Sequence, residues 1–232
     1  MTPSDDLAPV IRPPDALPRA DADHAVRAFV DAEAFSCLGA RAALHRPNHQ
    51  IAAYGALGAP DTTAALARDL AAFAATPAAG EDFATFVAVF APEADAMTEA
   101  TFETRLWDQL QRLADADPDA AWDPAVSDDP DEPLFSFCAA GTAFFVVGMH
   151  PAASRLARRF ALPALAFNPH AQFDRLRADG RYGSLREAIR ARERALQGSL
   201  NPNLSEFGER SDARQYAGRA VDDAWRCPFH RP

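Results

Sequence analysis

A cysteine precedes a predicted helix, in the segment Phe35-Ser36-Cys37-Leu38-Gly39. At a helix N-terminus the free backbone N–H groups and the helix dipole lower the pKa of a thiol and favour the thiolate. A glycine two residues later would let a flat ligand approach the backbone closely. A thiolate in this position can ligate a haem iron, and the electron density that it donates favours O–O cleavage. The alternative is a buried structural cysteine that packs as a small apolar residue.

Two histidines adjoin predicted strands and could ligate a metal. His150 ends a predicted hairpin in Gly148-Met149-His150-Pro151, where the following proline would hold it rigidly. Neutral imidazole is the other common haem ligand. The alternative is a hydrogen-bonded histidine at the end of a strand. His170, in Phe167-Asn168-Pro169-His170, could instead cap or precede the next helix.

Arginines gather shortly after His150. Arg155, Arg158 and Arg159 are spaced three and four apart, so they would share one face of a predicted helix. Such a cluster can bind carboxylates, including haem propionates, through bidentate hydrogen bonds. The alternative is a solvated basic face.

A polar segment near the C-terminus could bind a polar small molecule. It runs over residues 196–204, where Asn201 and Asn203 stand on either side of a proline, and Gln215 follows it. Amides and hydroxyls can orient a substrate, and we expect weak substrate contacts from Asn203 and Gln215. Three nearby carboxylates could face a cation: Glu206, Glu209 and Asp212. The alternative is a surface connection whose polar groups cap helices.

The composition excludes several classes of function. All 23 basic side chains are arginines, so the chain cannot form a lysine Schiff base and lacks the lysine of a Walker A loop or of a kinase. A net charge of -10 argues against sequence-independent binding to nucleic acid. Cys37, Cys138 and Cys227 form no CxxC pair, which disfavours a structural zinc site, and a disulfide framework is not expected in a cytosolic chain.

The length of the chain and its short apolar runs favour a single domain that does not enter a membrane. A chain of 232 residues falls in the single-domain range, and no apolar run is long enough to span a bilayer. The first residues lack the basic-then-apolar order of a signal peptide, so we expect a cytoplasmic protein without membrane contacts. Residues 1–23, rich in Pro, Asp and Ala, predict a flexible N-terminal arm, and residues 24–232 predict a single domain.

The apolar periodicity predicts helices and strands in mixed order. Helices are expected over residues 24–34, 37–44, 61–73, 98–113, 152–160, 171–178, 184–196 and 211–223. Strands are expected over 51–55, 83–90 and within 161–168, with a hairpin around 134–149 formed by the apolar runs 134–138 and 142–149. This order favours an α+β fold with a small, mostly antiparallel sheet surrounded by helices over a doubly wound sheet. The aromatic end of the chain, residues 225–229, is expected to dock on the core.

Several of these segments together resemble the YqcI/YcgG family. The matching segments run in order from Phe35 to Phe229: FSCLGARAAL, FATFVAVF, LWDQLQRL, FSFCAAGTAFFVVGMHPAASRLARRF, FNPHAQFDRLR, LQGSLNPNLSEFGERSDARQYAGR and WRCPF. Their order and spacing make the resemblance specific. Ser36 departs from the family pattern, in which proline is more frequent before the cysteine. That difference affects the stiffness of the loop and leaves the thiol in place.

The resemblance implies a single domain that binds haem b and catalyses an N-oxygenation. Characterised relatives in antibiotic and toxin pathways hydroxylate guanidine nitrogens of arginine or of arginine-derived substrates. The expected activity is therefore insertion of one oxygen atom into an N–H bond of a guanidine or amine. Dioxygen or peroxide would supply the oxygen, with an external electron donor for dioxygen. Haem performs the oxidation, while the protein supplies the axial ligand, a pocket and orientation. The protein could also form a homodimer, a question that the resemblance leaves open.

The resemblance covers both candidates for the axial iron ligand. Cys37 is the first choice because a thiolate suits oxygen activation, and His150 is the alternative. Arg41, one turn beyond Cys37, and Arg155 or Arg159 are expected to contact the propionates. Two other functions stay open: a haem-binding or gas-sensing protein without turnover, and a non-haem interaction scaffold with the acidic loop at residues 128–132 as its docking surface.

Overall fold

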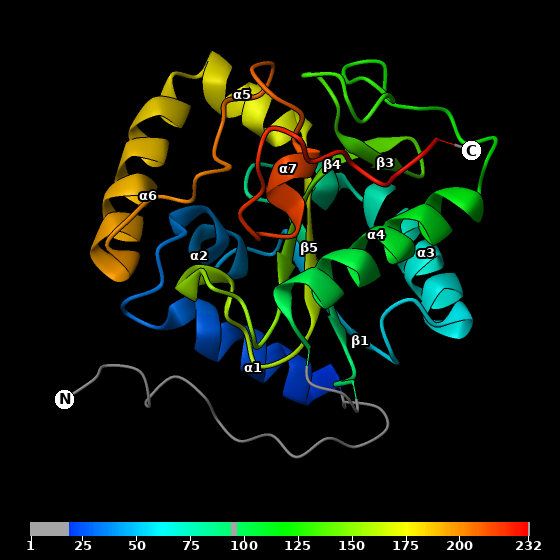
Figure 1. Ribbon diagram of the computed structural model, residues 1–232, viewed down its shortest axis with the longest axis horizontal. Helices are drawn as coiled ribbons and strands as arrows, with labels where there is room; N and C mark the ends of the chain where they lie inside the picture. The colour runs from blue at the N-terminus through cyan, green and yellow to red at the C-terminus, as the bar shows by residue number, and fades with distance from the viewer. Residues whose placement is uncertain (1–18, 94–96, 232) are drawn as a thin grey trace.

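A five-stranded mixed sheet forms the centre of the molecule. The computed structural model describes residues 19–93 and 97–231 (Figure 1). The strands are β1 (His49–Tyr54), β2 (Thr85–Phe90), β3 (Phe137–Ala139), β4 (Thr142–Met149) and β5 (Ala164–Pro169). They are ordered β1-β2-β5-β4-β3, and every neighbouring pair is antiparallel except β1 and β2. The predicted α+β fold with a mostly antiparallel sheet is confirmed.

Helices cover both faces of this sheet (Figure 1). One face carries α1 (Arg19–Asp31), α2 (Leu38–Leu44), α5 (Ala171–Ala178) and α6 (Arg181–Gln197). The other carries α3 (Pro60–Ala74) and α4 (Glu99–Asp115). A single turn, α7 (Ala213–Tyr216), packs against β4, and two short 3₁₀ helices are η1 (Pro77–Gly80) and η2 (Leu156–Arg158). Within the residues described, no helix combines the length and the apolar character needed to cross a membrane.

Alternation along the strands gives the two faces different neighbours. On β4, Phe144 and Val146 belong to the core shared with α3 and α4. Phe145 and Val147 point to the opposite face, because successive side chains of a strand alternate. The same alternation places Phe167 of β5 in the core with α3 and α4 and Ala166 on the other face.

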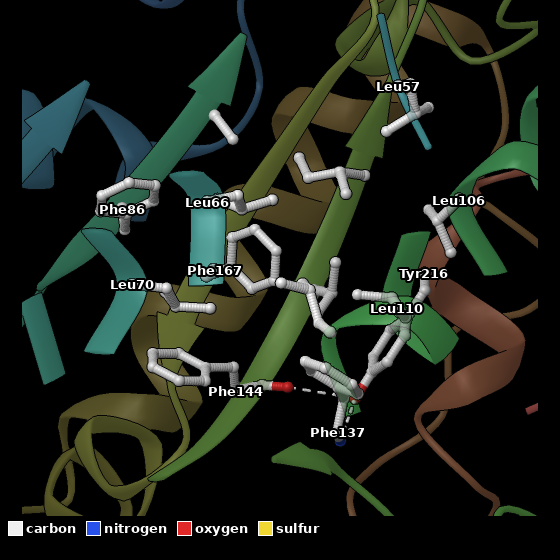
Figure 2. Packing of buried hydrophobic residues seen from close by; sticks show 14 of the residues in the cluster. Leu57, Leu66, Leu70, Phe86, Leu106, Leu110, Phe137, Phe144, Phe167 and Tyr216 are labelled. Atoms are coloured by element: carbon white, nitrogen blue, oxygen red, sulfur yellow. Dashed lines mark hydrogen bonds between the residues drawn. The ribbon is translucent and has the colours of Figure 1, made fainter. Parts of the chain in front are cut away.

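The larger core lies between the sheet and helices α3 and α4 (Figure 2). Its fully buried members include Leu66, Leu70, Phe86, Leu106, Leu110, Phe137, Phe144 and Phe167. Tyr216 is also buried there, and its hydroxyl donates to the Phe144 carbonyl at 3.1 Å and accepts the Phe137 N–H at 3.0 Å. The C-terminal docking is confirmed, because Phe229 is fully buried in this core.

The predicted helix over residues 152–160 is wrong. Apart from the short η2, the segment forms turns, and it folds back so that the His150 N–H donates to the Arg158 carbonyl at 3.0 Å. Arg155, Arg158 and Arg159 therefore do not share a helical face, and each side chain has different partners.

Two further boundaries differ from the prediction. The helix predicted over residues 211–223 shortens to α7, because Gly218 adopts a left-handed φ of 83° and turns the chain away. The predicted N-terminal arm, residues 1–23, lies mostly outside the described residues, but residues 19–23 already belong to α1. The hairpin around 134–149 is confirmed as β3 and β4, joined through Ala140 and Gly141, both at positive φ.

Candidate functional site

A cavity of about 370 Å³ lies on the face of the sheet opposite α3 and α4. Val87, Val147 and Ala166 form its apolar floor on β2, β4 and β5. Leu185 and Ile189 of α6 form the facing wall, and α1, α2 and α5 complete it. This volume is typical of pockets for small molecules and cofactors.

Helix α6 presents one face to the cavity. Tyr182, Leu185, Ile189 and Glu193 recur every three or four residues and all line it. None of the residues of α6 is buried, although two of these side chains are aliphatic. The helix therefore serves as a cavity wall and not as a layer of packed core.

Cys37 lies at one end of the cavity, at the N-cap of α2. Its Sγ accepts the Ala40 N–H at 3.4 Å, so the predicted position before a helix is confirmed. The predicted lowering of the thiol pKa is wrong in direction. Burial raises the pKa of Cys37 and outweighs the opposing effects of the Ala40 and Gly39 N–H groups and of the Arg158 cation.

Arg158 is a cation in the cavity wall near Cys37. Its guanidinium donates to three backbone carbonyls: Gly148 at 3.1 Å, Tyr216 at 2.9 Å and Gln215 at 3.0 Å. Burial lowers the pKa of Arg158 to about 10, which leaves it charged at neutral pH. The sequence indicated an arginine cluster here but gave no separate role to Arg158.

A polar network ties the Cys37 segment to α6. The Arg155 Nε donates to Glu193 Oε1 at 3.1 Å, and its Nη1 donates to Ser199 Oγ at 3.0 Å. The hydroxyl of Ser36 donates to the other oxygen of Glu193 at 2.8 Å. Arg155, expected to contact a propionate, lines the cavity but is already paired with Glu193, a residue that the sequence reasoning missed.

His170, Asp212 and Phe207 form the other end of the cavity. The His170 ring lies 4.3 Å from the Phe207 ring, and its Nε2 lies 4.0 Å from Asp212 Oδ2. Its Nδ1 lies 3.6 Å from Asp174 Oδ2. Burial lowers the pKa of His170, which favours the neutral imidazole. Burial also raises the pKa of Asp212 to about 7.

The thiol and the imidazole lie toward opposite ends of α6. Ser36, next to Cys37, contacts Glu193 near the end of the helix. At its start, the Arg177 guanidinium lies 4.7 Å from the Tyr182 ring and 5.9 Å from the Phe207 ring that packs on His170. Tyr182 and Glu193 are separated by three helical turns, or roughly 16 Å at 1.5 Å per residue.

Two further arginines of α6 line the cavity at half-exposed positions. Arg186 Nη1 donates to Glu206 Oε1 at 2.8 Å, and Arg190 Nη2 donates to the same oxygen at 3.0 Å. Both side chains are about a third exposed, so they stand at the rim of the cavity. Their spacing of four along α6 was a signal that the sequence reasoning did not use.

Four of the predicted site residues lie outside the cavity. His150 is buried with its ring 4.3 Å from that of Phe102 of α4, and its Nδ1 makes no hydrogen bond to the described residues. Arg41 donates to the Asp31 carbonyl at 3.3 Å, and Arg159 donates to the Ala153 carbonyl at 2.7 Å.

Asn203, the fourth of these residues, does not line the cavity and has a structural role instead. Its amide nitrogen donates to the carbonyls of Arg214 at 2.9 Å and Arg219 at 2.6 Å, so it holds the C-terminal segment together. Of the predicted site residues, the structure brings Cys37, Arg155 and Gln215 to the cavity. The other candidates from the sequence that line it are His170, Arg158, Asn201, Glu206 and Asp212.

Comparisons with known proteins cover almost the whole described chain. A family model for the YqcI/YcgG family matches residues 26–230. The Bacillus subtilis (strain 168) protein named "Uncharacterized protein YqcI" is 26% identical over 204 residues, which cover 84% of this chain and 80% of that protein. No solved structure matches the chain. The family match includes every cavity residue named above.

Proposed function

The chain belongs to the YqcI/YcgG family, and from this premise we propose that it is a haem-dependent N-oxygenase. Its substrate is a guanidine or amine nitrogen of a small, arginine-like molecule. One observation carries the proposal: a cavity with apolar walls holds a thiol toward one end and a neutral imidazole beside a carboxylate toward the other.

The residues of the cavity fit a haem group. A flat macrocycle needs two apolar walls, which the sheet supplies through Val147 and Ala166 and α6 supplies through Leu185 and Ile189. Its propionates need cations near solvent, and Arg186 and Arg190, each about a third exposed, stand at the rim. Both are paired with Glu206 and would exchange that partner for a propionate. These two replace Arg41 and Arg159 in the proposal, because the latter pair lies outside the cavity.

Cys37 would hold the iron. A coordinated metal deprotonates a thiol outright, so the raised pKa of the free thiol does not oppose ligation. The buried cation of Arg158 and the Ala40 N–H then stabilise the thiolate. His150 is not carried forward as the alternative ligand, because its ring packs on Phe102 outside the cavity.

Haem would supply the activation of dioxygen or peroxide and the transfer of one oxygen atom, and an external donor would supply electrons for dioxygen. The residues of the chain would bind and orient the haem and the substrate, and they would exclude water from the cavity. The aromatic rings of Phe145, Phe173 and Phe207 shield the end of the cavity around His170. The His170 imidazole would accept a hydrogen bond from the substrate and help to orient its nitrogen.

We also propose that the protein works in the cytoplasm. All three cysteines are free thiols, as is usual in a reducing compartment. Burial raises the pKa of both Cys138 and Cys227 to about 12. Neither residue lines the cavity, so neither is a candidate for the iron ligand.

The test is turnover by protein expressed with a haem precursor and purified with bound haem. Arginine and other guanidines would be incubated with labelled dioxygen and a reductant, or with labelled peroxide, and the products analysed by mass spectrometry. We expect a product that carries one labelled oxygen on nitrogen. Cys37→Ser should abolish its formation, whereas the matched Cys227→Ser, outside the cavity, should retain it. Haem binding without any oxygenated product would favour a gas sensor, and failure to bind haem would favour a non-haem scaffold.

A further inference from the structure

Asp212 places a carboxyl oxygen without a hydrogen-bond partner in the cavity wall. The residue is 3% exposed and precedes α7. Its Oδ2 is buried and has no hydrogen-bond partner among the residues that the structure describes. The nearest nitrogen of a basic side chain is His170 Nε2 at 4.0 Å, which is too far for a hydrogen bond. A buried carboxylate without a partner is costly, and proteins rarely keep one without a function.

The other two carboxylates that line the cavity are already paired. Glu193 accepts hydrogen bonds from Arg155 and Ser36, and Glu206 accepts them from Arg186 and Arg190. Within the described chain, Asp212 therefore differs from both, because the lone pairs of its Oδ2 remain available to a ligand.

The surroundings of Asp212 suit an organic cation. Phe145, Phe173 and Phe207 line the same cavity, and the last of these packs against His170 beside the carboxylate. Aromatic faces attract cations and tolerate the apolar part of a ligand. Burial lowers the pKa of His170 and so disfavours its cationic form. The Arg177 cation acts on Asp212 from a distance, but its guanidinium is paired with Asp174 at 2.8 Å.

We infer that Asp212 is the specificity-determining residue of the cavity and binds the cationic nitrogen group, guanidinium or ammonium, of its small-molecule ligand. The inference rests on the proposed function, because it names the subsite for the substrate of that reaction. One N–H of the ligand would donate to Oδ2, and the charge-assisted hydrogen bond would fix the nitrogen near His170. This subsite lies toward the opposite end of α6 from Cys37.

The experiment compares arginine and agmatine with citrulline, in which an uncharged ureido group replaces the guanidinium. Binding to the full chain, loaded with haem, is measured by isothermal titration calorimetry. We expect the wild type to bind at least one of the cations about tenfold to a hundredfold more tightly than citrulline. Asp212→Asn should lose this preference. Asp223→Asn makes the same change of net charge at a side chain 89% exposed and should retain it.

Haem content and melting temperature are measured on the same samples. Asp212→Asn preserves the shape of the side chain, so it should fold with wild-type haem content. If it keeps the preference for cations, or if the wild type has none, the inference is overturned while the oxygenase proposal can stand. If it loses haem together with ligand binding, Asp212 serves the cofactor and the inference is overturned as well. A wild type that takes up no haem defeats the proposed function, and the calorimetry still reports on Asp212.

Discussion

Glu193→Ala should destabilise the protein by about 3–5 kcal/mol, because it leaves the Arg155 guanidinium buried without its carboxylate. The two side chains are only 10% and 12% exposed, so the pair belongs with buried ion pairs and not with surface ones. Removal of one partner from such a pair costs the desolvation of the other.

The hydrogen bonds of Arg155 and Ser36 narrow the expected loss of stability in Glu193→Ala. Arg155 loses its Nε bond of 3.1 Å and a second bond from Nη2 to Glu193. It keeps its bonds to Ser199 Oγ at 3.0 Å and to the Ser199 carbonyl at 2.6 Å, which favours the lower part of the range. The Ser36 hydroxyl loses its acceptor at 2.8 Å, which adds about 0.5–1.5 kcal/mol.

The assay is urea denaturation followed by circular dichroism, with the free energy of unfolding extrapolated to water. Asp223→Ala is the control, because it breaks a 3.1 Å ion pair with Arg210 on the surface. The Arg210 side chain is 56% exposed and that of Asp223 is 89% exposed, so the free energy of unfolding should fall by less than about 1 kcal/mol. The double variant Arg155→Met/Glu193→Leu should recover most of the loss. A Glu193→Ala variant no less stable than the control would refute the reasoning.

Three further predictions concern the larger core. Tyr216→Phe leaves the buried Phe137 N–H unpaired and should cost about 1–3 kcal/mol in the same urea titration (Figure 2). Gly148→Ala should cost about 1–3 kcal/mol by overpacking, since its Cβ would lie 2.7 Å from Phe102 Cε1; an unchanged midpoint would contradict this. Burial lowers the pKa of His150 from 6.5 to about 4, so the unfolded state binds more protons between these values. Stability should fall with decreasing pH there, by up to about 1.4 kcal/mol per pH unit, and His150→Phe should flatten the slope measured by denaturation at several pH values.

Much of the fold could be predicted because the strands carry strong local signals. The segment that became β2 is aromatic and β-branched, as expected of a strand buried on both sides, and all six of its residues are buried. The β3–β4 hairpin followed from two apolar runs around Gly141. The helix over 152–160 failed because tertiary bonds from Arg158 to backbone carbonyls hold that segment in turns, which no local pattern reveals.

The site was harder to predict because its parts are far apart in the chain. Cys37 had a local signal and does line the cavity, but Glu193 and Asp212 gain their importance only from neighbours that folding brings close. Strand parity decides which of the two histidines, His150 or His170, faces the cavity. Met149 of β4 lines the cavity, so its neighbour His150 points away, whereas Asn168 of β5 lines it and His170, two residues later, does as well.

The absorption spectrum of the reduced carbon monoxide complex tests most directly whether this cavity holds haem on Cys37. Wild type, Cys37→Ser and His170→Asn would be expressed with a haem precursor and compared. We expect a Soret band at the long-wavelength position typical of thiolate ligation in the wild type and in His170→Asn, and its loss in Cys37→Ser. An imidazole-type band that Cys37→Ser leaves unchanged, or no Soret band in the wild type, would contradict it.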